Sequence, residues 1–240
     1  MNRRQVISVL LLLLCTIPAS ATLPATLQWD VRTGGSNNNG GAFDSGGASC
    51  GTDFSLQNTA QIAYTDLVIG GTTTQYTSVL NAVDSTIVCN VVQIISGTNC
   101  TVGWYTVNSQ AAAVATVDRS MGTAASVCVA NLGGALATPI TALEAAVAKN
   151  TVWIHSGTYT QTAVATMSGN AGPLYVFGYN STHGDGGTRP LLTTATNSVQ
   201  LIRTSNNGNA ELVFDNIDFS NTATTRAACL IAWGGSAELT

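Results

Sequence analysis

Two aspartates near the end of the chain form the nearest candidate pair for sugar chemistry. Asp215 and Asp218 lie three residues apart, on either side of Asn216. Hydrolysis of a glycosidic bond needs two carboxylates facing one groove, and a calcium-assisted lyase needs several carboxylates with a basic residue. Asn216 also predicts a corner, which would leave the two aspartates as solvated turn residues on different faces. Both interpretations stay open.

The densest polar cluster covers residues 183–189. It contains His183, Asp185 and Arg189 around three glycines and a threonine. The planar guanidinium of arginine binds carboxylates through two parallel hydrogen bonds. The cluster is therefore a candidate ligand-binding site for an anion or a sugar carboxylate.

Other catalytic motifs are missing from the sequence. There is no GxSxG elbow, HExxH pair, phosphate-binding loop or dinucleotide fingerprint, and two histidines give a Ser-His-Asp arrangement little to draw on. Without a CxxC motif or a Cys/His cluster, no zinc site is expected. We expect no cofactor, except calcium if the protein is a lyase.

The first 21 residues are typical of a cleavable secretory signal. Two arginines at positions 3 and 4 precede an apolar run from Val6 to Cys15, and residues 19–21 (Ala-Ser-Ala) suit the peptidase. The run has about 10 apolar residues, whereas a membrane span needs about 20. Twin-arginine and lipoprotein signals are the alternatives, but the run is leucine-dense and Leu14 is not the small residue expected before a lipid-modified cysteine.

The composition indicates an exported, lightly charged β protein. Only 8% of residues are charged and 45% are hydrophobic, which favours a packed core over disorder. Without the signal, six basic and twelve acidic residues remain, a formal charge of −6. This charge argues against nucleic acid or an anionic membrane as a partner.

Five cysteines remain after signal cleavage, enough for two disulfides. Cys89 and Cys100 flank a strand and a turn that could form a hairpin, so we predict that they pair. The spacing then leaves Cys50 to pair with Cys128. Cys229 is expected to be a buried thiol.

Short β-favouring segments dominate the first half of the chain. Residues 27–32 predict a strand, residues 33–41 a loop rich in Gly and Asn, and residues 63–130 a compact β subdomain. One helix is expected over residues 142–148, because Thr141 and Glu144 form a capping box.

Short apolar bursts separated by polar turns follow this helix. Such strands can stack in parallel as a coil, with an antiparallel sandwich as the alternative. In the first burst, alternation places His155 and Trp153 on one face and Val152 and Ile154 on the other.

Several segments resemble a known fold family. From Lys149 onward the sequence is similar to the first coils of the pectin-lyase-like superfamily of right-handed parallel β-helices, and residues 29–55 resemble the N-terminal regions of uncharacterised β-helix proteins from phages and environmental bacteria. The carrying segments are NTVWIHSGTY (150–159), VFGY (176–179), GDGGTRP (184–190) and FDNIDF (214–219).

The resemblance implies an all-β fold: a single-stranded right-handed parallel β-helix, preceded by a capping helix and an N-terminal β-rich subdomain. The expected boundaries are 1–21 for the signal, 22–138 for the subdomain, and 139–240 for the helix and the first coils. Two alternatives stay open: a short β-helix, or the start of a longer one with further coils beyond Thr240. It also implies that residues 184–189 form a turn in which Asp185 binds backbone amides and Arg189 holds the loop.

Function has two competing interpretations. The first is a secreted or cell-surface structural or adhesive protein that binds extracellular polysaccharide or other copies of itself. The second is a polysaccharide lyase or glycoside hydrolase whose active coils lie beyond Thr240 or use Asp215 and Asp218. A phage tailspike is disfavoured because tailspikes carry no secretory signal.

Overall fold

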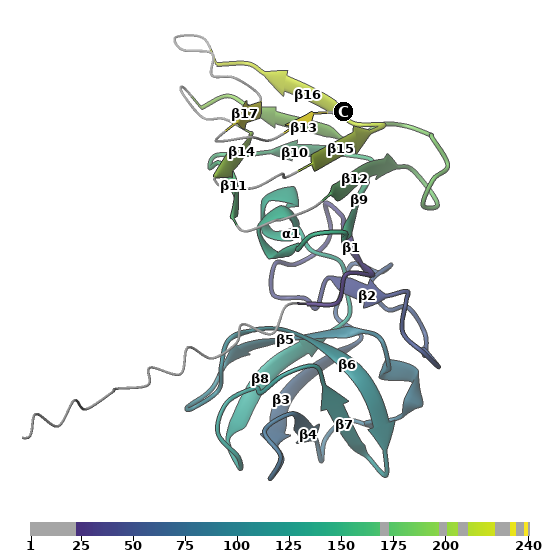
Figure 1. Ribbon diagram of the computed structural model, residues 1–240, viewed down its shortest axis with the longest axis vertical. Coiled ribbons are helices and arrows are strands. Elements are labelled where there is room, and N and C mark those ends of the chain that lie inside the picture. Colours follow the sequence, from purple (N-terminus) through teal and green to yellow (C-terminus); the bar gives the residue numbers. More distant parts are fainter. Residues whose placement is uncertain are drawn as a thin grey trace, which may run out of the picture.

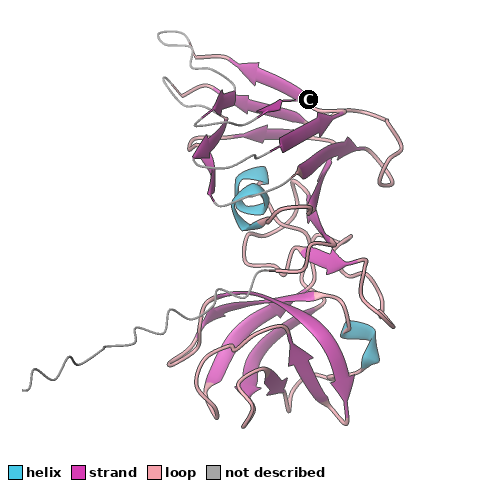
Figure 2. Ribbon diagram, viewed as in Figure 1, coloured by secondary structure: helices cyan, strands magenta, loops and turns pink. Residues whose placement is uncertain are grey.

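The computed structural model describes residues 23–168, 173–196, 201–205, 211–223, 231–233 and 238–239. Strands make up most of this part of the chain, as Figure 2 shows. The predicted signal at residues 1–21 and the expected buried thiol Cys229 lie outside the described residues.

A closed barrel of six antiparallel strands occupies the lower end of the molecule in Figure 1. In the strand over Ile62–Ile69, Tyr64, Leu67 and Ile69 are buried in the barrel, and a bulge between Tyr64 and Leu67 interrupts the alternation. The short 3-10 helix η1 (Ser85–Ile87) precedes one strand. In order around the barrel the strands are β3 (Ile62–Ile69), β4 (Gln75–Thr77), β7 (Val114–Val117), β6 (Gly103–Ala111), β5 (Val91–Ser96) and β8 (Val127–Leu132).

Three sheets occupy the upper end of the molecule (Figure 1). From β9 onward, each strand pairs in parallel with the strand three elements later. The first sheet is β18 (Glu238–Leu239), β15 (Glu211–Asp215), β12 (Leu174–Tyr179), β9 (Thr151–His155), β1 (Leu27–Val31) and β2 (Ala42–Asp44), with β1 and β2 antiparallel. The second is β10 (Thr158–Thr160), β13 (Leu191–Thr194) and β16 (Asp218–Asn221), and the third is β11 (Ala165–Ser168), β14 (Ile202–Ser205) and β17 (Ile231–Trp233).

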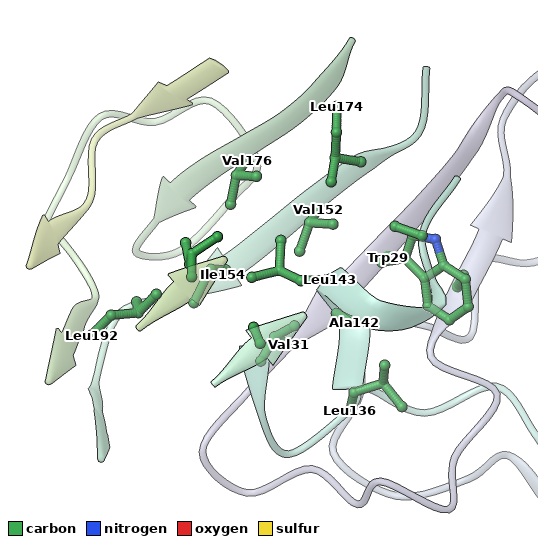
Figure 3. Close-up of a cluster of buried hydrophobic side chains, with 14 of the residues drawn as sticks. Trp29, Val31, Leu136, Ala142, Leu143, Val152, Ile154, Leu174, Val176 and Leu192 are labelled. Carbon is green, nitrogen blue, oxygen red and sulfur yellow. The ribbon is translucent and has the colours of Figure 1, made fainter. Parts of the chain in front are cut away.

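The helix α1 (Pro139–Ala145) lies between the barrel and the stacked sheets, as Figures 1 and 2 show. Its buried side chains Ala142 and Leu143 belong to the same apolar cluster as Val152 and Ile154 of β9 (Figure 3). All four are fully removed from water. The helix therefore supplies apolar side chains to the end of the sheet core that faces the barrel.

Two tryptophans join the barrel to the sheets. Trp29 of β1 meets Trp104 of β6 edge to face, with ring centroids 5.9 Å apart. The Trp29 indole N–H donates to the side-chain oxygen of Asn150 at 3.0 Å, and the Trp104 indole N–H donates to the carbonyl of Asn39 at 3.3 Å. The contact between the barrel and the sheets therefore combines aromatic packing with hydrogen bonds.

The secondary structure of the described residues is mostly β-strand, as expected for an all-β chain, but the β-helix expected from the sequence is wrong. The structure contains a closed antiparallel barrel, and its largest sheet is mixed, so the description as a right-handed parallel β-helix solenoid is overturned. A two-residue turn at Ala112 and Ala113, both with positive φ, helps to close the barrel. Such a turn normally carries Asn-Gly, so this hairpin has no sequence signal.

The helix exists, but it begins earlier than expected. Thr138, not Thr141, is the N-cap, and Pro139 occupies the first turn. Glu144 does not complete a capping box, because its carboxylate accepts the backbone N–H of Thr166 at 3.1 Å. The helix is therefore started by the Thr138 cap and tied by Glu144 to β11.

Both predicted disulfide pairings are wrong, although the same four cysteines are used. The bonds join Cys50 to Cys89 and Cys100 to Cys128. In the hairpin of β5 and β6, the backbone N–H of Cys89 donates to the carbonyl of Val107, so Cys100 is not opposite it. The register of the hairpin determines which cysteines lie close enough to form a disulfide. The spacing of the cysteines in the sequence does not reveal that register.

Candidate functional site

Four side chains form a row across the outward face of the first sheet. The strand register aligns Asp30 of β1 with Trp153 of β9, Trp153 with Phe177 of β12, and Phe177 with Asp215 of β15. We call these four residues the outer row. Val152 and Ile154, which alternate with Trp153, are fully buried, so the predicted facing of this strand is confirmed.

The middle of the outer row is an aromatic surface. The rings of Trp153 and Phe177 lie 4.9 Å apart with a 41° tilt, and Tyr175 lies parallel to Phe177 at 6.2 Å. All three rings are partly exposed. We call Trp153, Tyr175 and Phe177 the platform.

A hollow of about 270 Å³ adjoins the platform. Asp215 closes the row on one side, and no hydrogen bond of its carboxylate occurs among the described residues. Gly184 and Gly186, both with positive φ, line the opposite wall without side chains that would fill the space. The full lining is Trp153, Phe177, Gly178, Gly184, Gly186, Asp215 and Asn216.

At the other end of the row, Asp30 is a fully buried carboxylate with three side-chain partners. Its Oδ2 accepts the Tyr179 hydroxyl at 2.7 Å and lies 2.9 Å from Nε2 of His183. Its Oδ1 accepts the Nε–H of Arg32 at 2.8 Å. These contacts satisfy a charge that would otherwise be costly to bury.

The buried carboxylate also shifts the acidities of its neighbours. Burial, and then the nearby negative charge of Asp30, raise the pKa of Tyr179 well above its usual value. Burial lowers the pKa of Arg32, but the charge and hydrogen bond of Asp30 raise it more, so the net shift is upward. Tyr179 and Arg32 therefore act as fixed donors to Asp30 and not as proton carriers near neutral pH.

His183 links this cluster to the platform. Its ring stacks on Trp153, with centroids 4.4 Å apart and planes 6° apart, and meets Tyr179 edge to face. A second hollow of about 190 Å³ lies beside it, lined by Arg32, Leu56, Tyr179, Ser181, Thr182 and His183. His183 therefore fixes the loop after β12 and covers one face of the Trp153 ring.

Asp185 holds the same loop through backbone donors. Its carboxylate accepts the N–H groups of Ser181, Asn180, Gly187 and Thr182 at 2.6–3.1 Å. These bonds lower the pKa of Asp185 far below its ordinary value. Asp185 is therefore a loop-forming residue in this structure.

The structure gives Asp215 and Asp218 different surroundings and pairs Asp218 with Arg189. Asp215 lines the hollow, whereas Asp218 begins β16 and lies 3.3 Å from the guanidinium of Arg189 in an exposed ion pair. Arg189 also donates to the side-chain oxygen of Asn216 at 3.2 Å. The corner at Asn216, with φ of 56°, lies between the two aspartates in the chain.

Sequence reasoning missed most of this site. The sequence gives no local sign that Asp30, Arg32 and Tyr179 belong to a site. For Trp153 it predicts only that the side chain shares a strand face with His155. The available signal was the alternation in β9, which exposes an aromatic residue on a strand face where a polar one is usual. Asp30 and His183 are 153 positions apart in the sequence, so no local pattern reveals their contact.

No metal centre or membrane helix is apparent in the described part of the chain. No group of three His, Cys, Asp or Glu side chains there is placed to hold a metal ion. Within the same residues, no helix is long and apolar enough to span a bilayer.

No protein-family model, curated protein or solved structure matches this chain. The resemblance to the pectin-lyase-like superfamily is therefore wrong as an assignment, because the barrel and the mixed sheet depart from a parallel β-helix and no family match supports it.

Proposed function

We propose that this protein is an exported glycan-binding protein whose carbohydrate site is the platform with its adjoining hollow. The observation that carries the proposal is the alignment of Trp153, Phe177 and Asp215 across three adjacent strands. Aromatic rings pack against the apolar face of a sugar ring, while a carboxylate accepts its hydroxyl groups.

The charge of the site favours neutral glycans. Asp215 is the one charged residue in the lining of the hollow. Its carboxylate would repel a uronic acid, and the chain without its predicted signal is acidic overall. We therefore expect neutral oligosaccharides to bind more tightly than acidic ones of the same length.

Export is part of the proposal. Two disulfides, Cys50–Cys89 and Cys100–Cys128, are compatible with an oxidising compartment. The secretory signal expected at residues 1–21 points to the same place. An extracellular or cell-surface protein would meet polysaccharide there, and self-association stays a further prediction.

An enzyme remains the alternative, without a structural observation in its favour. A hydrolase needs two carboxylates on one groove, but Asp218 does not line the hollow that contains Asp215. We expect no release of reducing ends or unsaturated products from polysaccharides, with or without calcium.

The proposal is tested on a glycan array followed by calorimetric titration of the best neutral oligosaccharide. Trp153→Ala and Phe177→Ala should each weaken binding at least about tenfold, or about 1.4 kcal/mol, because each removes a stacking surface. Leu80→Ala is the matched control, since Leu80 is 72% exposed on the barrel side of the molecule. Thermal unfolding checks that each variant is folded.

Two results would contradict the proposal. One is a wild-type protein that binds no glycan on the array. The other is a pair of folded platform variants that bind as tightly as Leu80→Ala.

A further inference from the structure

We propose that a second binding site, built around Gln161, accepts a single neutral sugar ring or a polyol of similar size. It is a hollow of about 250 Å³ between the start of α1 and the strand β10. None of its lining residues belongs to the platform or to the hollow beside it. Its lining is Thr33, Ala137, Thr138, Pro139, Ile140 and residues 158–162.

Gln161 is the residue that marks this hollow as a site. Its side chain is buried, with the residue only 3% exposed, yet neither its amide oxygen nor its amide nitrogen has a hydrogen-bond partner among the described residues. Its backbone N–H donates to the carbonyl of Thr193 at 2.8 Å, so the strand itself is held in place. Folded proteins pair nearly all buried polar groups, because an unpaired one loses its water without compensation.

Other buried polar atoms without partners differ from Gln161 in one respect. Gln93 and Thr106 also have such atoms, but neither of them lines a described hollow. Gln161 alone among these residues has both an unpaired donor and an unpaired acceptor beside space that a ligand can occupy.

The neighbouring polar groups leave Gln161 as the anchor. The Tyr159 hydroxyl is already engaged, 2.8 Å from the carbonyl of His155 and 3.2 Å from that of Val31. The Thr138 hydroxyl contacts Thr141 at 2.9 Å in the helix cap. The Gln161 amide is therefore the buried polar side-chain group of this lining that has no hydrogen-bond partner in the described residues.

The chemistry of the lining selects a neutral ligand. No Asp, Glu, Lys, Arg or His lines the hollow, so an ionic group would lose its hydration without gaining a counter-charge. An amide offers one acceptor and two donors side by side. Two adjacent hydroxyls of a sugar ring match it, one donating to Oε1 and the other accepting from Nε2.

The shape supports the same class of ligand. Pro139 and Ile140 give the hollow an apolar wall for the carbon face of a ring, and Thr158, Thr160 and Thr162 are also among its lining residues. Its volume lies slightly below the range of about 300–1,000 Å³ that drug-sized ligands occupy. One ring therefore fits better than a chain of rings.

The test is a titration of the ¹⁵N-labelled protein with glucose, galactose and mannose, and separately with glucuronate. At least one neutral hexose should shift the side-chain NH₂ signal of Gln161 saturably, and glucuronate should not. Gln161→Met keeps the volume but removes the amide, so it should weaken the binding of that hexose at least about tenfold. Because Gln161→Met also removes an unpaired buried group, its thermal stability should equal or exceed that of the wild type.

Two controls separate this site from the platform. Gln57→Met changes a glutamine outside the hollow, whose amide donates to the carbonyl of Thr59, and it should leave hexose binding unchanged. Trp153→Ala should leave the hexose-induced shift of the Gln161 signal unchanged, because Trp153 does not line this hollow, so the two proposed sites can fail independently. If Gln161→Met does not fold, Thr160→Val removes a lining hydroxyl instead.

The inference is overturned if no neutral hexose moves the Gln161 signal, which would mean that water alone occupies the hollow. It is equally overturned if folded Gln161→Met binds the hexose as tightly as Gln57→Met does.

Discussion

At the scale of single residues, Asp30 controls the geometry of the candidate site. It has no exposed surface, and its charge is met by Tyr179, His183 and Arg32. His183 in turn stacks on Trp153. A carboxylate inside the sheet thus determines where one edge of the platform lies.

This arrangement predicts a specific loss when one donor is removed. Tyr179→Phe takes away a hydrogen bond to a buried charge, so the free energy of unfolding should fall by about 1.5–3 kcal/mol. Chemical denaturation measures the change. Tyr175→Phe is the control, because no hydrogen bond of its hydroxyl occurs in the described residues, and its effect should stay below about 0.5 kcal/mol. Equal effects of the two variants would show that the bond to Asp30 contributes nothing.

Prediction from sequence reached some of these residues and not others. The sequence identifies His183, Asp185 and Asp215 as candidates because each lies close to other polar residues in the chain. It does not identify Asp30, because Asp30 meets Tyr179 and His183 only after β1 pairs with β9, a contact between segments more than 100 residues apart. Local patterns carry no information about such pairing.

At the scale of elements, the loop from Asn180 to Pro190 shapes the hollow beside the platform. Asp185 holds it through four backbone N–H groups, and two glycines with positive φ carry it past the hollow. The loop therefore depends on one ionised carboxylate.

The loop should loosen only in strong acid. Because the folded pKa of Asp185 is depressed, its contribution is fully present above the unfolded pKa of about 3.9 and is lost as the pH falls toward the lower folded pKa. The amide protons of Ser181 and Gly187 should titrate in NMR spectra with a midpoint below about pH 3.9. Asp185→Asn should abolish this transition. A midpoint at or above the unfolded value would contradict the assigned hydrogen bonds.

The elements differ in how well the sequence predicts them. The sequence predicts the helix, but it places the N-cap at Thr141, three positions after the observed N-cap Thr138. The hairpin at Ala112 and Ala113 was not visible, because alanine seldom adopts the left-handed angles that this turn requires.

At the scale of the whole molecule, the barrel and the sheets are stabilised by different kinds of interaction. The barrel is closed by hydrogen bonds between its strands. Cys100–Cys128 joins the connection between β5 and β6 to β8, and Cys50–Cys89 joins two segments outside the barrel strands. Their sequence separations are 28 and 39, so each disulfide stabilises the fold by about 3.5–4 kcal/mol in the chain-entropy account. The sheets have no described disulfide and rely on the apolar cluster around α1 and β9. The site lies on the sheets, outside the barrel.

The whole architecture was the least predictable level. Short strands were expected along the entire chain, and the described residues contain them. Which strands close into a barrel depends on register and on long-range pairing, as between β1 and β9 across the barrel segment. A resemblance based on short turns and strand ends could not supply that information, and it led to the wrong fold class.

The most direct test of the central claim is a crystal structure of the protein with a bound neutral oligosaccharide. The account predicts a sugar ring stacked on Trp153 and Phe177, with a hydroxyl within hydrogen-bond distance of Asp215. A bare platform, with the oligosaccharide held on the barrel, would contradict it.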